Sequence, residues 1–221
     1  VYRETCKHLR IGKNIMANRQ TVGYGLTPTN TLGNTPSTQG QSQYTIETGD
    51  GTAIYNGEPV LLIVSLSAGT GGFLKTAAAG TTGDLLGVLN GCFFNASTTL
   101  KPTWSNYYPA STAPANSENI TAFVNDNPFQ EYQIALDAAL ADYTIAGKAV
   151  IAGLAIATNT SGTSTGGKSN ITADYATILA TAKNWRILRS AEDPDNNDFA
   201  AAFANIIVMQ NCKYSQLVAG V

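Results

Sequence analysis

Short apolar runs separated by glycine-rich or polar turns are the dominant pattern of the first half of this chain. Such runs occupy residues 60–64, 73–74 and 85–89. The run at 60–64, VLLIV, is apolar and partly β-branched, as expected of a strand buried on both faces. Asn56-Gly57 and Asn90-Gly91 are tight-turn signals, because Asn and Gly adopt a positive φ at low cost. A series of short strands punctuated in this way predicts a small β-barrel or β-sandwich.

The same pattern continues towards the C-terminus. Further strands are predicted at residues 43–46, 92–94, 120–124, 129–136, 146–157 (as a pair), 185–188 and 206–209. Residues 171–182 fit a strand or a short helix, and the alanines of residues 199–204 favour a helical turn. The predicted fold is all-β, a compact β-barrel or β-sandwich body with short helical segments and an extended N-terminal arm. The arm is residues 1–42 and the body is residues 43–221.

The N-terminal arm differs from the body in composition and charge. Residues 20–42 are rich in Thr, Gly, Asn, Pro and Gln, and are predicted to be extended with no core of their own. The first nineteen residues carry one acid against five basic residues, which are Arg3, Lys7, Arg10, Lys13 and Arg19. The tripeptide at 16–18 resembles a translation start, which would make residues 1–15 an upstream extension. A basic arm before an acidic body predicts contact with an acidic partner.

Overall composition narrows the class of protein. Charged residues make up 13% of the chain, about half of the usual share of about 25%. A surface with so few charges fits a protein that is largely covered by neighbours, and a stable secreted β-protein is the alternative. The net charge of −2 argues against general nucleic-acid binding. The longest near-apolar run, residues 145–157, is too short to span a membrane, and no secretory signal is visible.

The cysteines and the single histidine offer no metal or disulfide framework. Cys6, Cys92 and Cys212 form an odd set without C-x-x-C spacing, which favours free thiols in a reducing cytoplasm. His8 has no second histidine with which to share a metal. We therefore expect no cofactor and no metal centre.

Two motifs and one carboxylate pair are candidates for chemistry. Residues 162–169, GTSTGGKS, match the phosphate-loop pattern in which Lys168 would reach a bound phosphate. The residues that follow are a poor helix start, and too few remain for a parallel nucleotide-binding sheet. Asp126 and Glu131 flank a predicted hairpin turn, where exposed carboxylates are ordinary. No catalytic residue is therefore expected, and the chain is not predicted to be an enzyme.

An acidic stretch with Asp193, Asp195 and Asp198 has the spacing of a calcium loop. Asp198 stands where such a loop needs Gly, and Ala204 stands where it needs Glu. Two readings stay open at this point, which are a looser cation site and an Asx/Pro turn with Asp198 capping a helix.

Residues 95–119 form a long polar insertion that contains Trp104, Tyr107 and Tyr108. A loop of this length is uncommon unless it binds a partner or pairs with its own strand. Its aromatic side chains either pack onto the barrel or are exposed as interface anchors.

Several segments between residues 44 and 216 share their order and spacing with a known family. They are YTI at 44–46, IYNGEPV at 54–60, LGVLNGC at 86–92, SNYYPA at 105–110, AFVNDNP at 122–128, QI at 133–134, TGGKS at 165–169, RIL at 186–188 and DPDN at 193–196. Together they resemble the capsid cement, or head decoration, proteins of tailed bacteriophages. Residues 1–15 and 20–42 carry no pattern of that family.

The resemblance implies a virion structural protein, made in the host cytoplasm and bound to the outer surface of the phage head. There it would clamp adjacent subunits of the major capsid protein, as a homotrimer or another small homo-oligomer, without membrane or direct nucleic-acid contact. The basic residues of the arm would pair with acidic capsid surface. The alternative is an outward-facing carbohydrate- or host-binding virion module, in which Trp104, Tyr107 and Tyr108 stack on the ligand.

Overall fold

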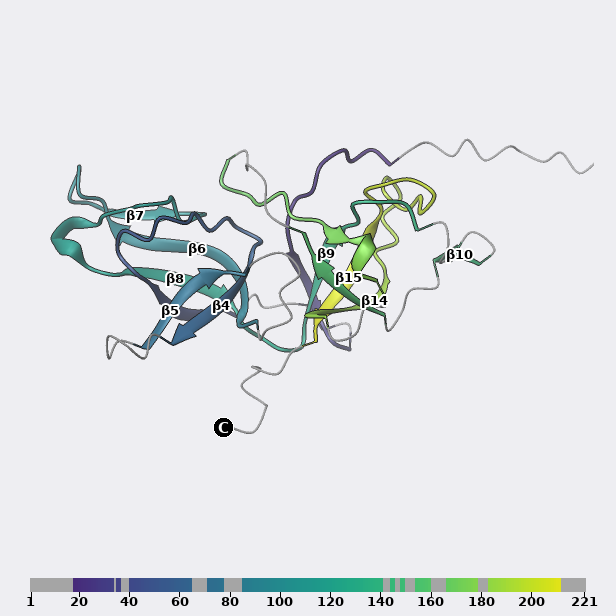
Figure 1. The fold of residues 1–221 in the computed structure, drawn as a ribbon, viewed down its shortest axis with the longest axis horizontal. Helices are drawn as coiled ribbons and strands as arrows, with labels where there is room; N and C mark the ends of the chain where they lie inside the picture. The colour runs from purple at the N-terminus through teal and green to yellow at the C-terminus, as the bar shows by residue number, and fades with distance from the viewer. Residues whose placement is uncertain are drawn as a thin grey trace, which may run out of the picture.

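The computed structural model describes residues 18–33, 35–36, 40–64, 71–77, 85–140, 144–145, 148–149, 154–159, 166–178 and 183–211. These residues form a closed β-barrel and a second, open β-sheet, each with its own hydrophobic core (Figure 1). Helical structure in this part of the chain is limited to the 3₁₀ turns η1 (Ala115–Ser117) and η3 (Tyr175–Thr177). The predicted all-β fold is confirmed. None of these turns has the length or apolarity needed to cross a membrane.

The barrel consists of five strands and an added edge strand. Its elements are β3 (Ser42–Ile46), β4 (Pro59–Val64), β5 (Gly71–Thr76), β6 (Gly87–Asn95), β7 (Pro102–Ser105) and β8 (Ile120–Asn125). The order is β4-β5-β3-β8-β6, and β6 closes the barrel by pairing back with β4. The later half of β6 pairs instead with β7. Inward-facing Ile46, Val60, Leu74 and Ile120 are fully buried and fill the barrel.

Strand β6 differs from the prediction. It runs as one nine-residue strand, so the turn predicted at Asn90-Gly91 is wrong, and the register against β8 slips there instead. A β-carbon on Gly91 would lie 2.6 Å from the Trp104 ring and 2.8 Å from the Ser105 carbonyl oxygen. Glycine is therefore needed for the close approach of β7 and not for a turn.

The other predicted turn, at Asn56-Gly57, is confirmed. Gly57 has a φ of +86°, and the Glu58 N–H donates to the Tyr55 carbonyl over 3.1 Å. The strand that follows is not buried on both faces, because Leu62 and Ile63 are exposed while Val60 is buried. A strand in a barrel wall is buried only on the face that points into the barrel, so a continuous apolar run does not require burial on both faces.

The open sheet has the order β13-β12-β14-β15-β9-β1-β2. Its strands are β1 (Thr27–Thr31), β2 (Thr35–Pro36), β9 (Gln130–Ala135), β12 (Ala155–Thr158), β13 (Ala173–Asp174), β14 (Trp185–Ser190) and β15 (Asn205–Gln210). All pairs are antiparallel. A further short pair, β10 (Thr144–Ile145) and β11 (Lys148–Ala149), stands apart. In the core of the open sheet, the rings of Tyr132 and Trp185 meet edge to face, with centroids 5.6 Å apart.

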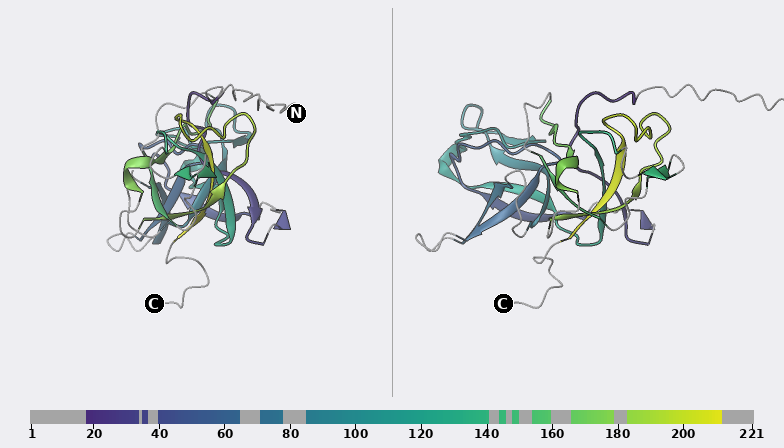
Figure 2. Two further views of the ribbon diagram at one scale, coloured as in Figure 1. Left: turned by 90° about the vertical axis from the view of Figure 1, so that its right-hand side faces the viewer. Right: turned by 45° about the vertical axis from the view of Figure 1, so that its right-hand side comes forward.

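Part of the predicted arm belongs to the open sheet. Strand β1 pairs with β9, and Leu26 just before it is buried in the sheet's core. The expectation that residues 20–42 lack a core is wrong here, because β9 supplies a partner that the Thr-rich sequence does not reveal. Leu26 also donates its N–H to the Gly57 carbonyl of the barrel over 2.9 Å, which ties the two lobes together. The two lobes lie side by side in the right-hand view of Figure 2.

Candidate functional site

The described chain begins at Asn18, and this residue is anchored to the turn between β14 and β15. Its amide nitrogen donates to the carbonyl oxygens of Asp198 (2.9 Å) and Ala202 (2.7 Å). Its amide oxygen accepts the N–H of Asp198 over 3.0 Å. One side chain thus satisfies three backbone groups of the turn and fixes the point at which the N-terminal segment meets the body.

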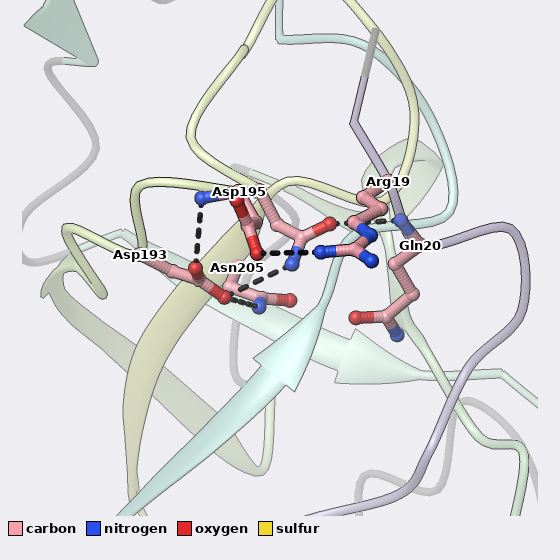
Figure 3. Close-up of polar contacts among 6 residues, drawn as sticks. Arg19, Gln20, Asp193, Asp195 and Asn205 are labelled. Atoms are coloured by element: carbon pink, nitrogen blue, oxygen red, sulfur yellow. Dashed lines mark hydrogen bonds and ion pairs between the residues drawn. The ribbon is translucent and has the colours of Figure 1, made fainter.

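Arg19 and Gln20 continue the anchor along the same turn (Figure 3). The Gln20 N–H donates to the Asn196 side-chain oxygen over 2.8 Å, and the Arg19 N–H donates to the Asp195 carbonyl over 3.2 Å. The Arg19 guanidinium lies 3.4 Å from the Asp195 carboxylate, with both side chains exposed. Such an exposed pair contributes little stability, so the backbone bonds hold the segment.

The acidic stretch is a hydrogen-bonded turn. One oxygen of Asp193 accepts the Asp195 N–H (3.0 Å), and the other accepts the side-chain amides of Asn196 (3.0 Å) and Asn205 (2.8 Å). These bonds, led by that from Asn196, lower the pKa of Asp193. The described residues contain no group of acidic, His or Cys side chains suited to a metal ion. The structure therefore favours the Asx-turn reading of Asp193, Asp195 and Asp198 over the cation site.

The helix predicted after Asp198 does not form. Residues 199–203 consist of turns and a bend, and the Asp198 carboxylate accepts the N–H of Ala200, the second of these residues, over 3.0 Å. The Asp198 carbonyl accepts the Ala201 N–H over 3.2 Å, as in a turn. It also accepts the Asn18 amide, which donates to the Ala202 carbonyl as well. The bonds from Asn18 therefore stabilise a turn at the place where the helix was expected.

The remaining basic residues predicted to contact a partner are not placed. Arg3, Lys7, Arg10 and Lys13 lie outside the described residues, as do His8, Cys6 and Cys212. What the structure does place is Arg19, which is largely exposed beside the anchor.

Two of the three predicted aromatic anchors pack onto the barrel. Tyr108 is fully buried, and its hydroxyl donates to the Asp50 carbonyl over 2.8 Å. Tyr107 is half-buried, and its ring stacks on that of Tyr55 at 5.6 Å and 15°. The Tyr108 ring is therefore inaccessible, and one face of the Tyr107 ring is covered by Tyr55.

Trp104 is the predicted aromatic anchor that remains exposed. It lies on β7, its ring is tilted against Phe123 with centroids 5.2 Å apart, and about half of the residue faces solvent. Phe93 stands directly opposite on β6 and is also exposed. Sequence reasoning missed Phe93, although its alternation with buried Cys92 was the available signal.

The phosphate-loop match is a loop pinned to the barrel in its described part, residues 166–169. The Asn56 N–H donates to the Gly167 carbonyl (3.0 Å), and the Ser169 N–H donates to the Asn56 carbonyl (2.8 Å). No helix begins at Lys168, since residues 168–172 contain only an isolated bridge and loop. The Lys168 ammonium lies 5.5 Å from the centroid of the Tyr24 ring. The helix N-terminus that would hold a phosphate is missing here.

The carboxylates of Asp126 and Glu131, which were predicted to lie exposed at a turn, both bind side chains of other strands. Glu131 is buried and forms a bidentate ion pair with Arg189, at 3.2 and 2.6 Å. Asp126 accepts the Tyr44 hydroxyl over 2.7 Å. Both groups thus hold strands together, and the prediction that they lie exposed at a turn is wrong for Glu131.

Cys92 is a buried thiol inside the barrel. Its Sγ donates to the Tyr107 carbonyl over 3.3 Å, and burial raises its pKa to about 12. At neutral pH it is therefore protonated, and a protonated thiol is a poor nucleophile.

No family model, curated protein or solved structure matches this chain. We therefore infer function from two surfaces of the chain itself. One is the anchored N-terminal segment at residues 18–20, and the other is the exposed aromatic face of β6 and β7.

Proposed function

We propose that this chain is a capsid cement, or head decoration, protein of a tailed bacteriophage. It binds the outer surface of the head and clamps adjacent subunits of the major capsid protein. The observation that carries the proposal is the anchor at Asn18, which tethers four further basic residues to a fixed point on a β-rich body. The sequence resemblance supports the same assignment.

The mechanism is coverage and attachment. A basic arm laid over a neighbouring subunit adds interface area, and the area buried across a subunit boundary opposes separation of the two subunits. Each exposed ion pair adds only about 0.2–1 kcal/mol, so several must act together. Packaged DNA pushes the shell outward, and clamps on the outer surface resist that expansion. The small share of charged residues, 13%, fits a surface that neighbours cover.

The proposed form on the head is a homo-oligomer, and the resemblance implies a trimer or another small homo-oligomer. It places several arms around one symmetry axis, and multivalent attachment strengthens binding without any new contact within each arm.

The second candidate, a carbohydrate- or host-binding virion module, is favoured by one observation. Trp104 exposes about half of its surface, and an exposed indole can stack on a sugar ring. Tyr107 and Tyr108, which were expected to share that role, are packed against the barrel. Binding to a glycan array but not to capsids would support this candidate over the first.

The role of the arm is tested by binding the protein to phage heads that lack it. These heads are purified from the phage that encodes the chain. Removing residues 1–15 should weaken binding to these heads by about 30-fold, since four pairs at about 0.5 kcal/mol each total about 2 kcal/mol. The measurement is the amount of protein that co-sediments with heads over a range of concentrations.

A matched variant separates charge from length. Replacing Arg3, Lys7, Arg10 and Lys13 together by Ser keeps the arm but removes its charge, and should weaken binding as much as the deletion. Added salt should weaken the binding of the parent protein to heads, but not the binding of this variant. Unchanged binding of both variants would rule out a role for the arm.

A further inference from the structure

The hairpin made by β6 and β7 displays an unusual amount of apolar surface. Phe93 is 40% exposed, Trp104 is 52% exposed and Leu100, in the turn between the strands, is 74% exposed. Phe93 and Trp104 are direct cross-strand partners, so their side chains lie on the same outer face of the barrel. Phe93 and Trp104 thus share one exposed apolar face, Leu100 is exposed in the turn of the same hairpin, and exposed apolar side chains gathered on one hairpin mark an interaction site.

Strand β7 is also a sheet edge. The barrel sheet ends at β7, which in the described part of the chain pairs with β6 on one side. An edge strand flanked by apolar side chains is a template for another strand, and proteins protect such edges or use them for binding. Strand β7 is four residues long and begins at Pro102, directly after Lys101, so the part of the edge without charge or proline is Thr103 to Ser105.

Leu100 adds an observation that stability of the single chain does not explain. Its φ is +54°, a left-handed conformation that costs a leucine about 1 kcal/mol or more. The turn is closed by backbone bonds with Ala96, which any residue at this position could make. Because Leu100 is mostly exposed, it gains little from burial within the chain, while Asn or Asp would suit both the backbone and the solvent.

The charge pattern identifies the partner. Residues 85–117, which span β6 and β7, contain Lys101 as their one charged residue, and β3 and β8 contain none. A strongly charged partner would have to bury its charges unpaired on this face, which is costly. A second copy of this chain offers the same uncharged face and therefore avoids that cost.

We propose that the face formed by Phe93, Leu100 and Trp104, together with the β7 edge, binds a second copy of this chain. The contact lies on the barrel lobe, whereas the anchored segment lies on the open-sheet lobe beside β15 (Figure 1). Self-association at the barrel thus leaves the anchor uncovered. The inference deepens the proposed function, on which its setting on a phage head rests, but the contact itself is between copies of this chain.

The test is the mass of the full chain in solution, measured by sedimentation equilibrium over a wide concentration range. We expect the parent protein to form a dimer, because a contact between the same face of two copies closes around a two-fold axis. Leu100→Asp should raise the dissociation constant at least tenfold, as loss of an interface anchor does. Compared at a concentration at which both proteins are monomeric, its unfolding midpoint should stay the same or rise, because Asp accepts a positive φ more readily than Leu.

Two further variants complete the design. Phe93→Ser removes a second anchor and should also favour the monomer. Leu32→Asp, at a 50% exposed leucine in the turn after β1, is the matched control and should leave the mass unchanged.

A parent protein that is monomeric at every concentration would overturn the self-contact, as would an oligomer that Leu100→Asp leaves intact. If Leu100→Asp instead lowers binding to heads while the parent is monomeric, the capsid covers this face and the inference fails, although the proposed function stands. An oligomer that dissociates as expected but never binds heads would support the contact and contradict the proposed function.

Discussion

We expect Arg189→Met to lower the free energy of unfolding by about 3 kcal/mol. Glu131 on β9 has a side chain only 2% exposed, and both of its oxygens are bonded to the Arg189 guanidinium of β14. Removing the arginine leaves a buried carboxylate without its counter-charge, which costs about 3–5 kcal/mol. The lower end applies because Arg189 is 44% exposed, so water can enter after its removal. Urea unfolding of the two proteins measures the difference.

Substitution of the other partner of the ion pair, Glu131, provides the control. Glu131→Gln leaves Arg189 free to turn its half-exposed guanidinium to water, so it should cost less, about 1–2 kcal/mol. The ion pair spans β15, which lies between β9 and β14, and therefore joins two strands that are not neighbours in the sheet. A larger loss from Glu131→Gln than from Arg189→Met would contradict this account of the pair.

The second large effect is expected for Gly87→Ala. An added β-carbon would lie 2.3 Å from the Asn125 carbonyl oxygen and 2.9 Å from a methyl of Val124, both on β8. Gly87 also pairs with Val60 on β4, at the point where the barrel closes. β8 cannot move away from Gly87 without breaking its pairing with β6, and β6 cannot move away from β8 without straining its pairing with β4, so we expect a loss of about 2–3 kcal/mol. The corresponding fall in Tm, roughly 5–10 °C for a chain of this size, is measurable by calorimetry.

Gly51→Ala is the matched glycine variant. Nothing lies within 4 Å of its added β-carbon, and its φ is outside the left-handed region. Alanine there should be neutral or should stabilise the protein slightly by restricting the unfolded chain. Equal Tm values for the two variants would show that β6 and β8 are not as close as described.

Much of the strand pattern was accessible from the sequence. The runs at β8, β14 and β15 are apolar, bounded by turn residues and nearly correct in extent. Asn56-Gly57 was correct because its turn depends only on local φ preferences. Features set by local conformation were therefore predictable.

Features set by distant partners were not. Asn90-Gly91 carries the same turn signal, yet Gly91 is required by the ring of Trp104 on another strand. Leu26 is an isolated apolar residue in a polar stretch, and only pairing of β1 with β9 buries it. Likewise, Glu131 finds Arg189 across an intervening strand, so its burial could not be read from its neighbours in sequence.

The candidate site divides in the same way. That Arg19 belongs to a basic arm followed from composition, but the anchoring role of Asn18 depends on a turn far away in the sequence. The three aromatic residues of the long insertion looked equivalent in sequence. Pairing of β7 with β6 exposes Trp104, whereas the hydrogen bond to Asp50 holds Tyr108 inside the barrel.

The most direct test of the proposed role is the copy number of this chain in purified phage particles. Quantitative mass spectrometry of intact virions, calibrated on the major capsid protein, gives the ratio of the two chains. We expect a fixed ratio that matches the capsid lattice, with this chain accessible to antibody on the outer surface of the head. A copy number as low as that of a portal or tail component would contradict the assignment as a cement protein.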